Sequence, residues 1–187
     1  ISGGALYRKA SFLLDQAGHS VFSPIINIRQ NPHQVSASGS ALFDREGVAT
    51  ATRDLVSKGL LQGYVLDAYA ARHLGLESTG NAGGVFNLEI EPTGGDCQSL
   101  LTEMGTGLLV TEMMGQGANR VTGDYSRGAA GFWVEGGEIA YPVENITVAG
   151  NLKNMYKNIR AVGNDVDTRG NIRSGSILID DLTVAGQ

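Results

Sequence analysis

The chain has 187 residues, and its 42% hydrophobic content is enough to bury a sizeable core in one domain spanning residues 1–187. Its 14 Lys and Arg against 19 Asp and Glu give a net charge of −5, and no basic stripe could neutralise several phosphates, so direct binding of nucleic acid is not expected. The single cysteine, Cys97, excludes an internal disulfide and a cysteine-only zinc site, and no apolar run reaches the ~20 residues of a membrane span.

The compartment and the ends of the chain lead to two further expectations. A lone cysteine is typical of a reducing compartment, so the cytoplasm is the expected location. The first four residues, ISGG, include no initiator methionine and do not follow the order of a signal peptide, so we expect a piece of a longer protein. The 27 glycines are scattered, which predicts many tight turns between strands.

The first forty residues predict a helix, an edge strand and a loop. Apolar residues at helical spacing predict a helix over residues 5–16, with Gly18 as the left-handed residue after its end. Residues 21–28 are rich in β-branched side chains, but Pro24 cannot donate to a ladder, so we expect an edge strand there. Residues 31–40 are polar and predict an exposed loop.

The next segment predicts a hairpin followed by a short helix. Two apolar-rich runs within residues 53–66 flank a Lys58-Gly59 turn, which is the pattern of a β-hairpin. Asp67 is a suitable N-cap for a helix over residues 68–74, and Gly75 is suited to end it.

A loop, a strand and a capped helix are predicted in the middle of the chain. Small polar residues make 78–84 a loop, and residues 85–91 alternate apolar with polar from Phe86 onward, which predicts a strand with one face in water. Asp96 is then expected to cap a helix that runs through Met104 and stops at Gly105.

The last third is predicted to be mainly strand. Residues 108–113 predict a buried strand, and residues 131–141 predict a hairpin whose two-residue loop is Gly136-Gly137. Helical spacing favours a helix over residues 151–162, and residues 176–184 form one more β-rich segment. The fold class is therefore α+β and mainly β, with antiparallel strands and hairpins forming a sandwich or a partly open barrel with a few short helices.

Potential metal ligands and nucleophiles are sparse. His19, His33 and His73 are widely separated, and no pair has the i,i+4 spacing that places two imidazoles on one helix face, so structural roles are favoured over a metal site. Cys97 falls in the first turn of a predicted helix, where the dipole could activate a thiol. Its neighbours are small and polar, without an adjacent His or Lys, so we interpret it as inert.

Residues 122–131 gather unusual chemistry among glycines that allow close backbone approach. The candidate substrate- or partner-binding side chains are a carboxylate, a phenol, a hydroxyl and a guanidinium: Asp124, Tyr125, Ser126 and Arg127. Such a loop could grip a peptide, or it could be a rigid turn in which the Asp and the Arg pair with each other or with backbone. Both interpretations stay open.

A second candidate follows the last predicted helix. Asn164 and Asp165 come directly after Gly163, where a turn that ends the helix and a ligand site are both possible. The turn is favoured, and the two residues are kept as tentative binding residues.

A long block of sequence resembles a known family. Residues 107–117 (GLLVTEMMGQG) and 122–135 (TGDYSRGAAGFWVE) closely resemble the PmbA, or TldE, branch of the TldD/PmbA family, called peptidase U62-like and modulator of DNA gyrase. Shorter segments extend the resemblance over nearly the whole chain: 2–9, 43–48, 71–76, 139–143, 146–152, 162–165 and 184–187. The resemblance implies that residues 1–187 are the C-terminal domain of a longer chain.

The resemblance also implies a function shared with a partner. Members of this branch pair with a TldD-like subunit to form a cytoplasmic metalloprotease that processes unfolded peptides, and the zinc is expected in the TldD partner. TldD-type chains carry an H-E-x-x-x-H helix and a cysteine near the C-terminus, whereas residues 171–176 (NIRSGS) contain no cysteine. The resemblance therefore implies a non-catalytic partner subunit without a cofactor of its own.

Three alternatives remain open from the sequence. The first is a regulatory binding protein that acts on DNA gyrase or on its toxin-antitoxin partners, as the older family name suggests. The second is a hydrolase that depends on Cys97. The third concerns assembly, because the chain could also form a homodimer when it is alone.

Overall fold

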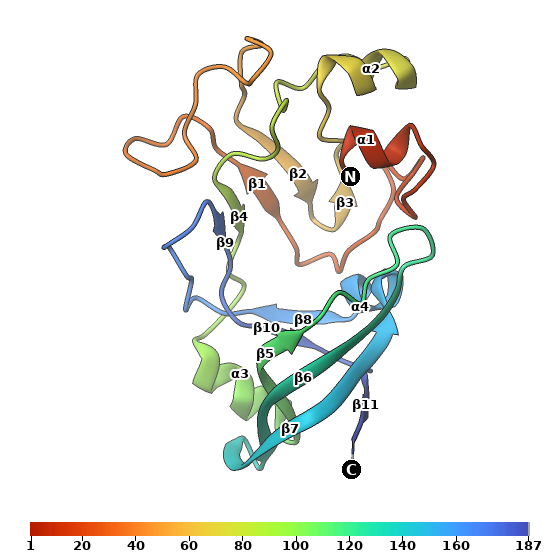
Figure 1. Cartoon of the computed structure of the whole chain (residues 1–187). Coiled ribbons are helices and arrows are strands. Elements are labelled where there is room, and N and C mark those ends of the chain that lie inside the picture. Colours follow the sequence, from red (N-terminus) through yellow and green to blue (C-terminus); the bar gives the residue numbers. More distant parts are fainter. Residues whose placement is uncertain (187) are drawn as a thin grey trace.

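Three sheets organise the computed structural model, which describes residues 1–186, so Gln187 of the expected domain lies outside the described part (Figure 1). A five-stranded sheet in the upper half has the order β3-β2-β1-β4-β9: Leu60–Leu61, Arg53–Ser57, Ile28–Gln30, Leu88–Ile90 and Ile172–Arg173. A four-stranded sheet in the lower half has the order β11-β7-β6-β5: Thr183–Ala185, Glu138–Asn151, Asp124–Glu135 and Gly107–Met114. Between them, β10 (Ile177–Ile179) pairs with β8 (Ile159–Val162).

The predicted fold class is confirmed. Within the described residues every strand pair is antiparallel except β4 with β9, the sheets do not close into a barrel, and only four short helices occur. The helices are α1 (Gly3–Leu6), α2 (Ala68–Leu74), α3 (Cys97–Met104) and α4 (Leu152–Lys157). No helix among residues 1–186 combines the length and the apolar character that crossing a bilayer requires.

The predicted caps and turns are confirmed where local chemistry decides the backbone. The Asp67 carboxylate accepts the Ala70 N–H at 2.7 Å at the start of α2, and Gly75 ends that helix with a φ of 67°. Asp96 accepts the Ser99 N–H at 2.9 Å at the start of α3.

Both predicted hairpins are present. Lys58 and Gly59 turn β2 into β3 with φ angles of 48° and 77°. Gly136 and Gly137, with φ angles of 61° and 82°, turn β6 into β7, and the paired strands extend far beyond the predicted residues 131–141. Positive φ at both turn positions matches the twist of the strands.

The helix predicted over residues 5–16 and the strand predicted over residues 21–28 were wrong, whereas residues 31–40 form the predicted loop. The helix expected over residues 5–16 ends at Leu6, because Lys9 and Asp15 adopt left-handed backbone with φ angles of 54° and 59°. The strand expected over residues 21–28 starts only at Ile28. Tertiary contacts outweigh local propensity here: the Phe12 N–H, for example, donates to the Arg120 carbonyl at 2.8 Å.

Three other predicted elements are shorter or more exposed than expected. The strand over residues 85–91 is reduced to β4, because Asn87 has a φ of 43°. The helix over residues 151–162 stops at Lys157, and β8 takes the remainder because it pairs with β10. The strand expected to be buried, β5, is half-buried to exposed along its length.

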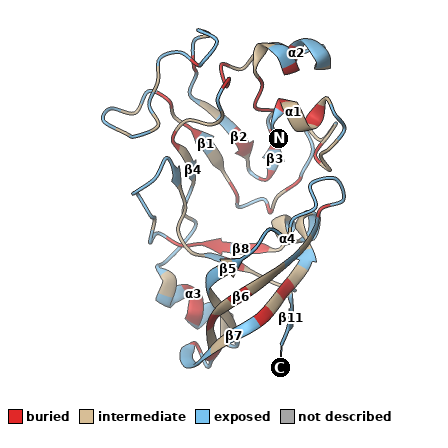
Figure 2. Cartoon of the chain, in the orientation of Figure 1, coloured by how far each residue is buried: buried red, intermediate tan, exposed pale blue. Residues whose placement is uncertain are grey.

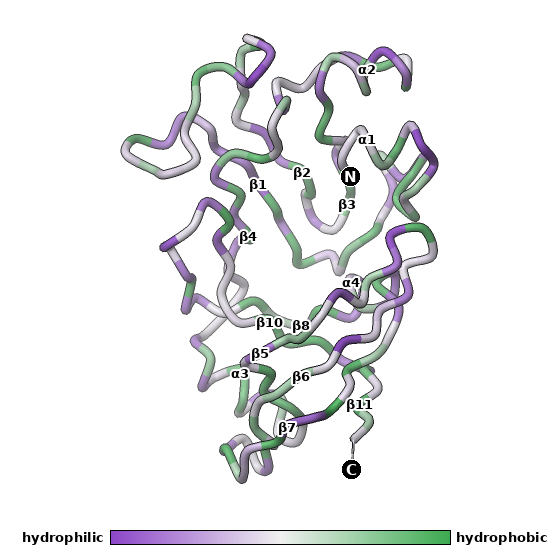
Figure 3. Tube along the Cα trace, in the orientation of Figure 1, coloured by the Kyte–Doolittle hydropathy of each residue, from purple (hydrophilic) through white to green (hydrophobic). Residues whose placement is uncertain are grey.

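The core lies mainly beneath the five-stranded sheet and reaches β8. Its largest cluster includes Leu6, Ile26 and Leu61 together with Ile159 and Val162 of β8, whereas Ala161 packs into a second cluster with Leu100 and Leu178. Figure 2 shows β8 as a largely buried strand, and Figure 3 shows hydrophobic residues recurring along the strands while hydrophilic stretches occupy many loops. Strand β8 thus joins the two halves of the molecule.

A candidate binding cleft between two sheet edges

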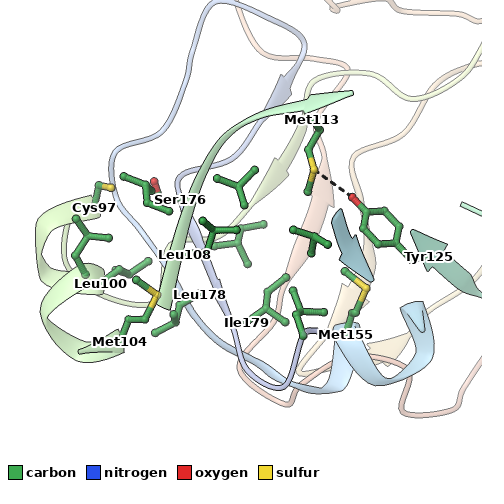
Figure 4. A pocket seen from close by; sticks show the side chains of 16 residues that line it. Cys97, Leu100, Met104, Leu108, Met113, Tyr125, Met155, Ser176, Leu178 and Ile179 are labelled. Atoms are coloured by element: carbon green, nitrogen blue, oxygen red, sulfur yellow. Dashed lines mark hydrogen bonds between the residues drawn. The ribbon is translucent and has the colours of Figure 1, made fainter. Parts of the chain in front are cut away.

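An apolar cavity of about 320 Å³ lies between the lower sheet and the β8–β10 pair (Figure 4). Leu108, Leu109 and Val110 of β5 line one side, and Leu178 and Ile179 of β10 line another. Helix α3 closes one end, while α4 and β6 contribute side chains at the other. Because most of the lining is apolar, the cavity is suited to hydrophobic groups.

Sulfur-bearing side chains are concentrated in this cavity. The chain contains four methionines and one cysteine, and all but one of these five residues line the cavity: Cys97, Met104, Met113 and Met155. Figure 4 shows Cys97 and Met104 at the α3 end and Met113 and Met155 at the opposite end. Methionine is flexible and polarizable, so a lining rich in this residue can adapt to apolar groups of different shapes.

Two strands with a free edge border the cavity. Strand β5 is the last strand of its sheet and pairs only with β6, and β10 pairs only with β8 within the described part of the chain. Each strand therefore has one edge whose backbone groups have no strand partner. Such edges can hydrogen-bond to an extended chain that lies alongside them.

The segment around the first predicted site forms a strand, which corrects the expectation of a loop. Residues 124–131 belong to β6, where they pair with β7 and, from Gly128 onward, with β5. The candidate residues 124–127 are held by β7 on one side and, on the other, by the connection from β5, where the Ser126 N–H donates to the Gly117 carbonyl at 2.8 Å. Within the predicted segment 122–131, only Thr122 and Gly123 lie outside β6.

Asp124 and Arg127 bond to nearby residues of the fold and do not pair with each other. Asp124 accepts hydrogen bonds from the Thr122 hydroxyl at 2.6 Å and from Asn151 Nδ2 at 3.0 Å, and these two bonds, in this order, hold the pKa of Asp124 below its usual value. The Arg127 guanidinium donates to the backbone carbonyl of Met113 at 3.1 Å. Arg127 thus bonds to backbone, as the rigid-turn alternative expects, whereas Asp124 bonds to two side chains.

Tyr125 and Ser126 face different surroundings. The Tyr125 ring lines the apolar cavity, and its hydroxyl lies 3.7 Å from Met113 Sδ (Figure 4). Ser126 is exposed beside a shallow depression, and its backbone N–H donates to the Gly117 carbonyl at 2.8 Å. Of the four candidates in this segment, only Tyr125 reaches the cavity.

Asn164 and Asp165 follow β8, so the prediction that they follow a helix was wrong. The Asn164 N–H donates to the Gly95 carbonyl at 3.0 Å, next to the start of α3. The Asp165 carboxylate accepts the Ser176 hydroxyl at 2.6 Å and the Ser176 N–H at 3.1 Å. The bond from the hydroxyl is the largest influence on the pKa of Asp165, which stays below its usual value although burial and the charge of Asp96 act against this.

The structure thus brings two of the six predicted residues to one cavity. Tyr125 lines it directly at one end, and Asp165 reaches its other end through Ser176. Sequence reasoning missed the walls of the cavity, which come from segments far apart in the chain: 97–113, 148–155 and 176–182. The only signal in the sequence was that few methionines occur and most belong to these segments.

The residues present do not fit a zinc ion. His33 Nε2 lies 3.1 Å from the Thr50 hydroxyl, and the His73 ring stacks on Tyr7 with 5.2 Å between ring centroids. Nowhere in residues 1–186 do three His, Cys, Asp or Glu side chains gather in a way that could hold a metal. Structural zinc sites need about four such donors and catalytic sites about three, so no catalytic step can be assigned to a metal in this part of the chain.

Comparison with known proteins identifies the family. Residues 1–186 match the profile of the PmbA/TldA metallopeptidase C-terminal domain. The chain is 53% identical over 187 residues to metalloprotease PmbA of Escherichia coli O157:H7, and the match covers 100% of this chain but 42% of that protein. The chain therefore spans less than half the length of this relative.

Solved structures agree with the sequence match. A candidate modulator of DNA gyrase from Bacteroides thetaiotaomicron superposes with a TM-score of 0.94 at 34% identity, covering 100% of this chain and 42% of that one. TldE from Thermococcus kodakarensis superposes with a TM-score of 0.85 at 25% identity, covering 99% of this chain and 45% of that one.

Proposed function

Because the chain belongs to the PmbA/TldA metallopeptidase family, whose C-terminal domain matches residues 1–186, we propose that it is the C-terminal domain of a non-catalytic partner subunit in a TldD/TldE-type protease. In this proposal the native protein is longer, acts in the cytoplasm and pairs with a TldD-like subunit. The substrates of the pair are unfolded peptides.

The observation that carries the proposal is the mismatch between a metallopeptidase family and the donor set of this domain. The chain aligns along its whole length with a relative named a metalloprotease. Its histidines, however, are engaged in separate contacts, and no three potential ligands meet among the described residues. A family named for a metal-dependent activity, combined with a domain whose described residues offer no metal site, favours a subunit that acts beside a metal-bearing partner.

The role that fits this domain is to hold and orient the substrate. A zinc ion bound elsewhere would activate water and polarise the scissile carbonyl. Two features offer contacts for an extended chain: the apolar cavity between β5 and β10, and the free strand edges beside it. Fixing a flexible peptide before cleavage lowers the entropic cost of reaching the reactive geometry.

A regulatory protein that acts on DNA gyrase is the second candidate. It is favoured by the likeness to the Bacteroides structure, which is described as a candidate modulator of that enzyme. Affinity purification from cells separates the two proposals. Recovery of gyrase without a TldD-like chain would support regulation, whereas recovery of a TldD-like chain supports the partner subunit.

Reconstitution tests the proposed function directly. The native-length protein is incubated with a fluorogenic, unstructured peptide, either alone or with an equimolar TldD-type subunit. We expect no hydrolysis by this protein alone and strong hydrolysis by the mixture, because the metal that activates water belongs to the partner.

Two results would oppose the proposal. One is hydrolysis by this protein alone at the rate of the mixture, and the other is a partner that cleaves equally well without it. The partner treated with a chelator and then mixed with this protein is the control for metal dependence.

A further inference from the structure

We propose that the cavity between β5 and β10 binds an apolar side chain of an extended peptide, while Asp96 and Asp165 at its α3 end bind a Lys or Arg of the same peptide. The proposal deepens the proposed function by defining which peptides this subunit selects, and it rests on that function only in regarding the peptide as a substrate. Three independent features support it: the lining, the strand edges and the charges at the mouth.

The lining defines the group that the cavity accepts. A volume of about 320 Å³ bordered by Leu108, Leu109, Leu178 and Ile179 admits a large aliphatic or aromatic side chain. Burial of such a side chain favours binding, because it removes apolar surface from water. The methionines at both ends of the cavity can adjust to different shapes, which suits selection of apolar character over one particular residue.

The two strand edges define the backbone conformation of the occupant. Strands β5 and β10 lie on either side of the cavity, and each pairs on one edge only within the described residues. An extended peptide added to one of these edges gains main-chain hydrogen bonds and directs alternate side chains to the same face. A side chain can then enter the cavity while its neighbours remain in solvent.

The charges at the mouth define the residue beside the apolar one. Asp96 directly precedes Cys97, which lines the cavity, and Asp165 is hydrogen-bonded to Ser176, which also lines it. The Asn164 N–H donates to the Gly95 carbonyl at 3.0 Å, which brings together the residues that directly adjoin the two carboxylates, and the charge of Asp96 acts on Asp165. Both have a pKa below the usual value, because hydrogen bonds from Ser99 and Ser176 stabilise the charged forms, so both are ionised at neutral pH.

The negative charge of this pair is not neutralised within the described part of the chain. The ion pairs found there join Arg29 with Asp54, Arg160 with Glu103 and Asp180, and Arg169 with Asp167. Neither Asp96 nor Asp165 takes part in them. A cationic side chain on the occupant supplies the missing opposite charge, whereas a second copy of this chain, with its net charge of −5, brings mainly like charge.

Protection of Cys97 measures occupancy of the cavity. The native-length protein is treated with iodoacetamide, and alkylation of Cys97 is followed by mass spectrometry of its proteolytic peptide. The probe is a capped ten-residue peptide in which leucine alternates with serine and two lysines follow. At a probe concentration about ten times its Kd, roughly nine-tenths of the sites are filled, so alkylation should slow about tenfold.

Paired variants separate the apolar contact from the charge. Asp96→Asn with Asp165→Asn keeps an oxygen to accept the N–H groups of Ser99 and Ser176, and we expect the double variant to bind the lysine probe about three- to tenfold more weakly. A probe with serine in place of lysine should bind this variant and the parent protein equally. The control is Asp67→Asn, which removes one charge from the N-cap of α2 and should leave the affinity for both probes unchanged.

A second pair of variants tests the cavity itself. Leu109→Asn is expected to weaken the binding of both probes. Leu60→Asn, at a leucine that is 42% exposed on β3, should leave the binding of both probes unchanged. Unhindered alkylation of Cys97 at every probe concentration, or equal affinity of both probes for the parent protein, would overturn the inference. Binding is measured without the partner subunit, so a negative result here leaves the reconstitution result standing, and the reverse is also true.

Discussion

Gly131→Ala is expected to lower the free energy of unfolding by about 3 kcal/mol, because overpacking at a buried position forces the backbone to move. Gly131 lies in β6 opposite Val110 of β5, and a Cβ added there would meet the Leu109 carbonyl oxygen and lie 3.0 Å from Val110 Cα. Neither neighbour is the flexible end of a side chain, so β5 itself must shift. Urea unfolding followed by circular dichroism measures the change.

Gly128→Ala is the matched control for Gly131→Ala. Gly128 belongs to the same strand, but an added Cβ would meet only the Met114 side chain, at an ordinary distance of 3.5 Å. We expect a change of at most about 0.5 kcal/mol for this variant. Because β5 forms a wall of the cavity, Gly131→Ala should also alter the rate of Cys97 alkylation. Equal stability of the two variants would contradict the close packing of β5 on β6.

Asp44→Ala is the second substitution with a large expected effect. We expect it to lower the free energy of unfolding by about 4 kcal/mol, because hydrogen bonds to a charged group contribute roughly 1.5–3 kcal/mol each. The Asp44 side chain is only 4% exposed and accepts the N–H groups of Glu46, Val48 and Ala82 at 2.9, 3.0 and 2.8 Å. Alanine would leave these donors without their acceptor. The exposed Asp54, paired with Arg29, is the control, and Asp54→Ala should cost no more than about 1 kcal/mol.

The contribution of Asp44 to the free energy of unfolding should also depend on pH. Burial alone raises the pKa of the Asp44 carboxyl, but the N–H groups of Ala82, Val48 and Glu46 together hold the pKa below its usual value. A carboxyl with a lowered pKa in the folded state stabilises the fold above its unfolded pKa of about 3.9, and this stabilisation is lost as the pH falls through the folded pKa. Urea unfolding between neutral pH and pH ~3 should therefore show the difference between the parent protein and Asp44→Ala becoming smaller. A difference in the free energy of unfolding that stays constant over this pH range would show that the stabilisation does not come from the ionised Asp44 carboxylate.

The sequence predicted the elements that local chemistry determines. Asp67 and Gly75 define α2 because a carboxylate cap and a left-handed glycine act within a few residues. The Gly136-Gly137 turn follows from the same kind of reasoning. The helix expected over residues 5–16 was wrong because contacts with distant residues, such as the Tyr64 hydroxyl accepting the Gln16 N–H, hold the chain in turns.

The candidate site was only partly predictable. Asp124 and Arg127 were selected for their chemistry, but the structure joins them to Asn151 and to the Met113 carbonyl and not to each other. The cleft forms where β5 and β10 approach each other, and these strands are separated by more than sixty residues. No spacing rule within one segment reports such a contact, so Tyr125 was identified without the cavity that surrounds it.

The zinc content of the purified complex tests the partner-subunit proposal most directly. The native-length protein is prepared alone, as is the TldD-type subunit, and the complex is formed from both; each is then dialysed and analysed for metal and for mass. The proposal predicts a single zinc ion per heterodimer and none in this protein by itself. Stoichiometric zinc in this protein alone, held by three of its own side chains, would contradict it.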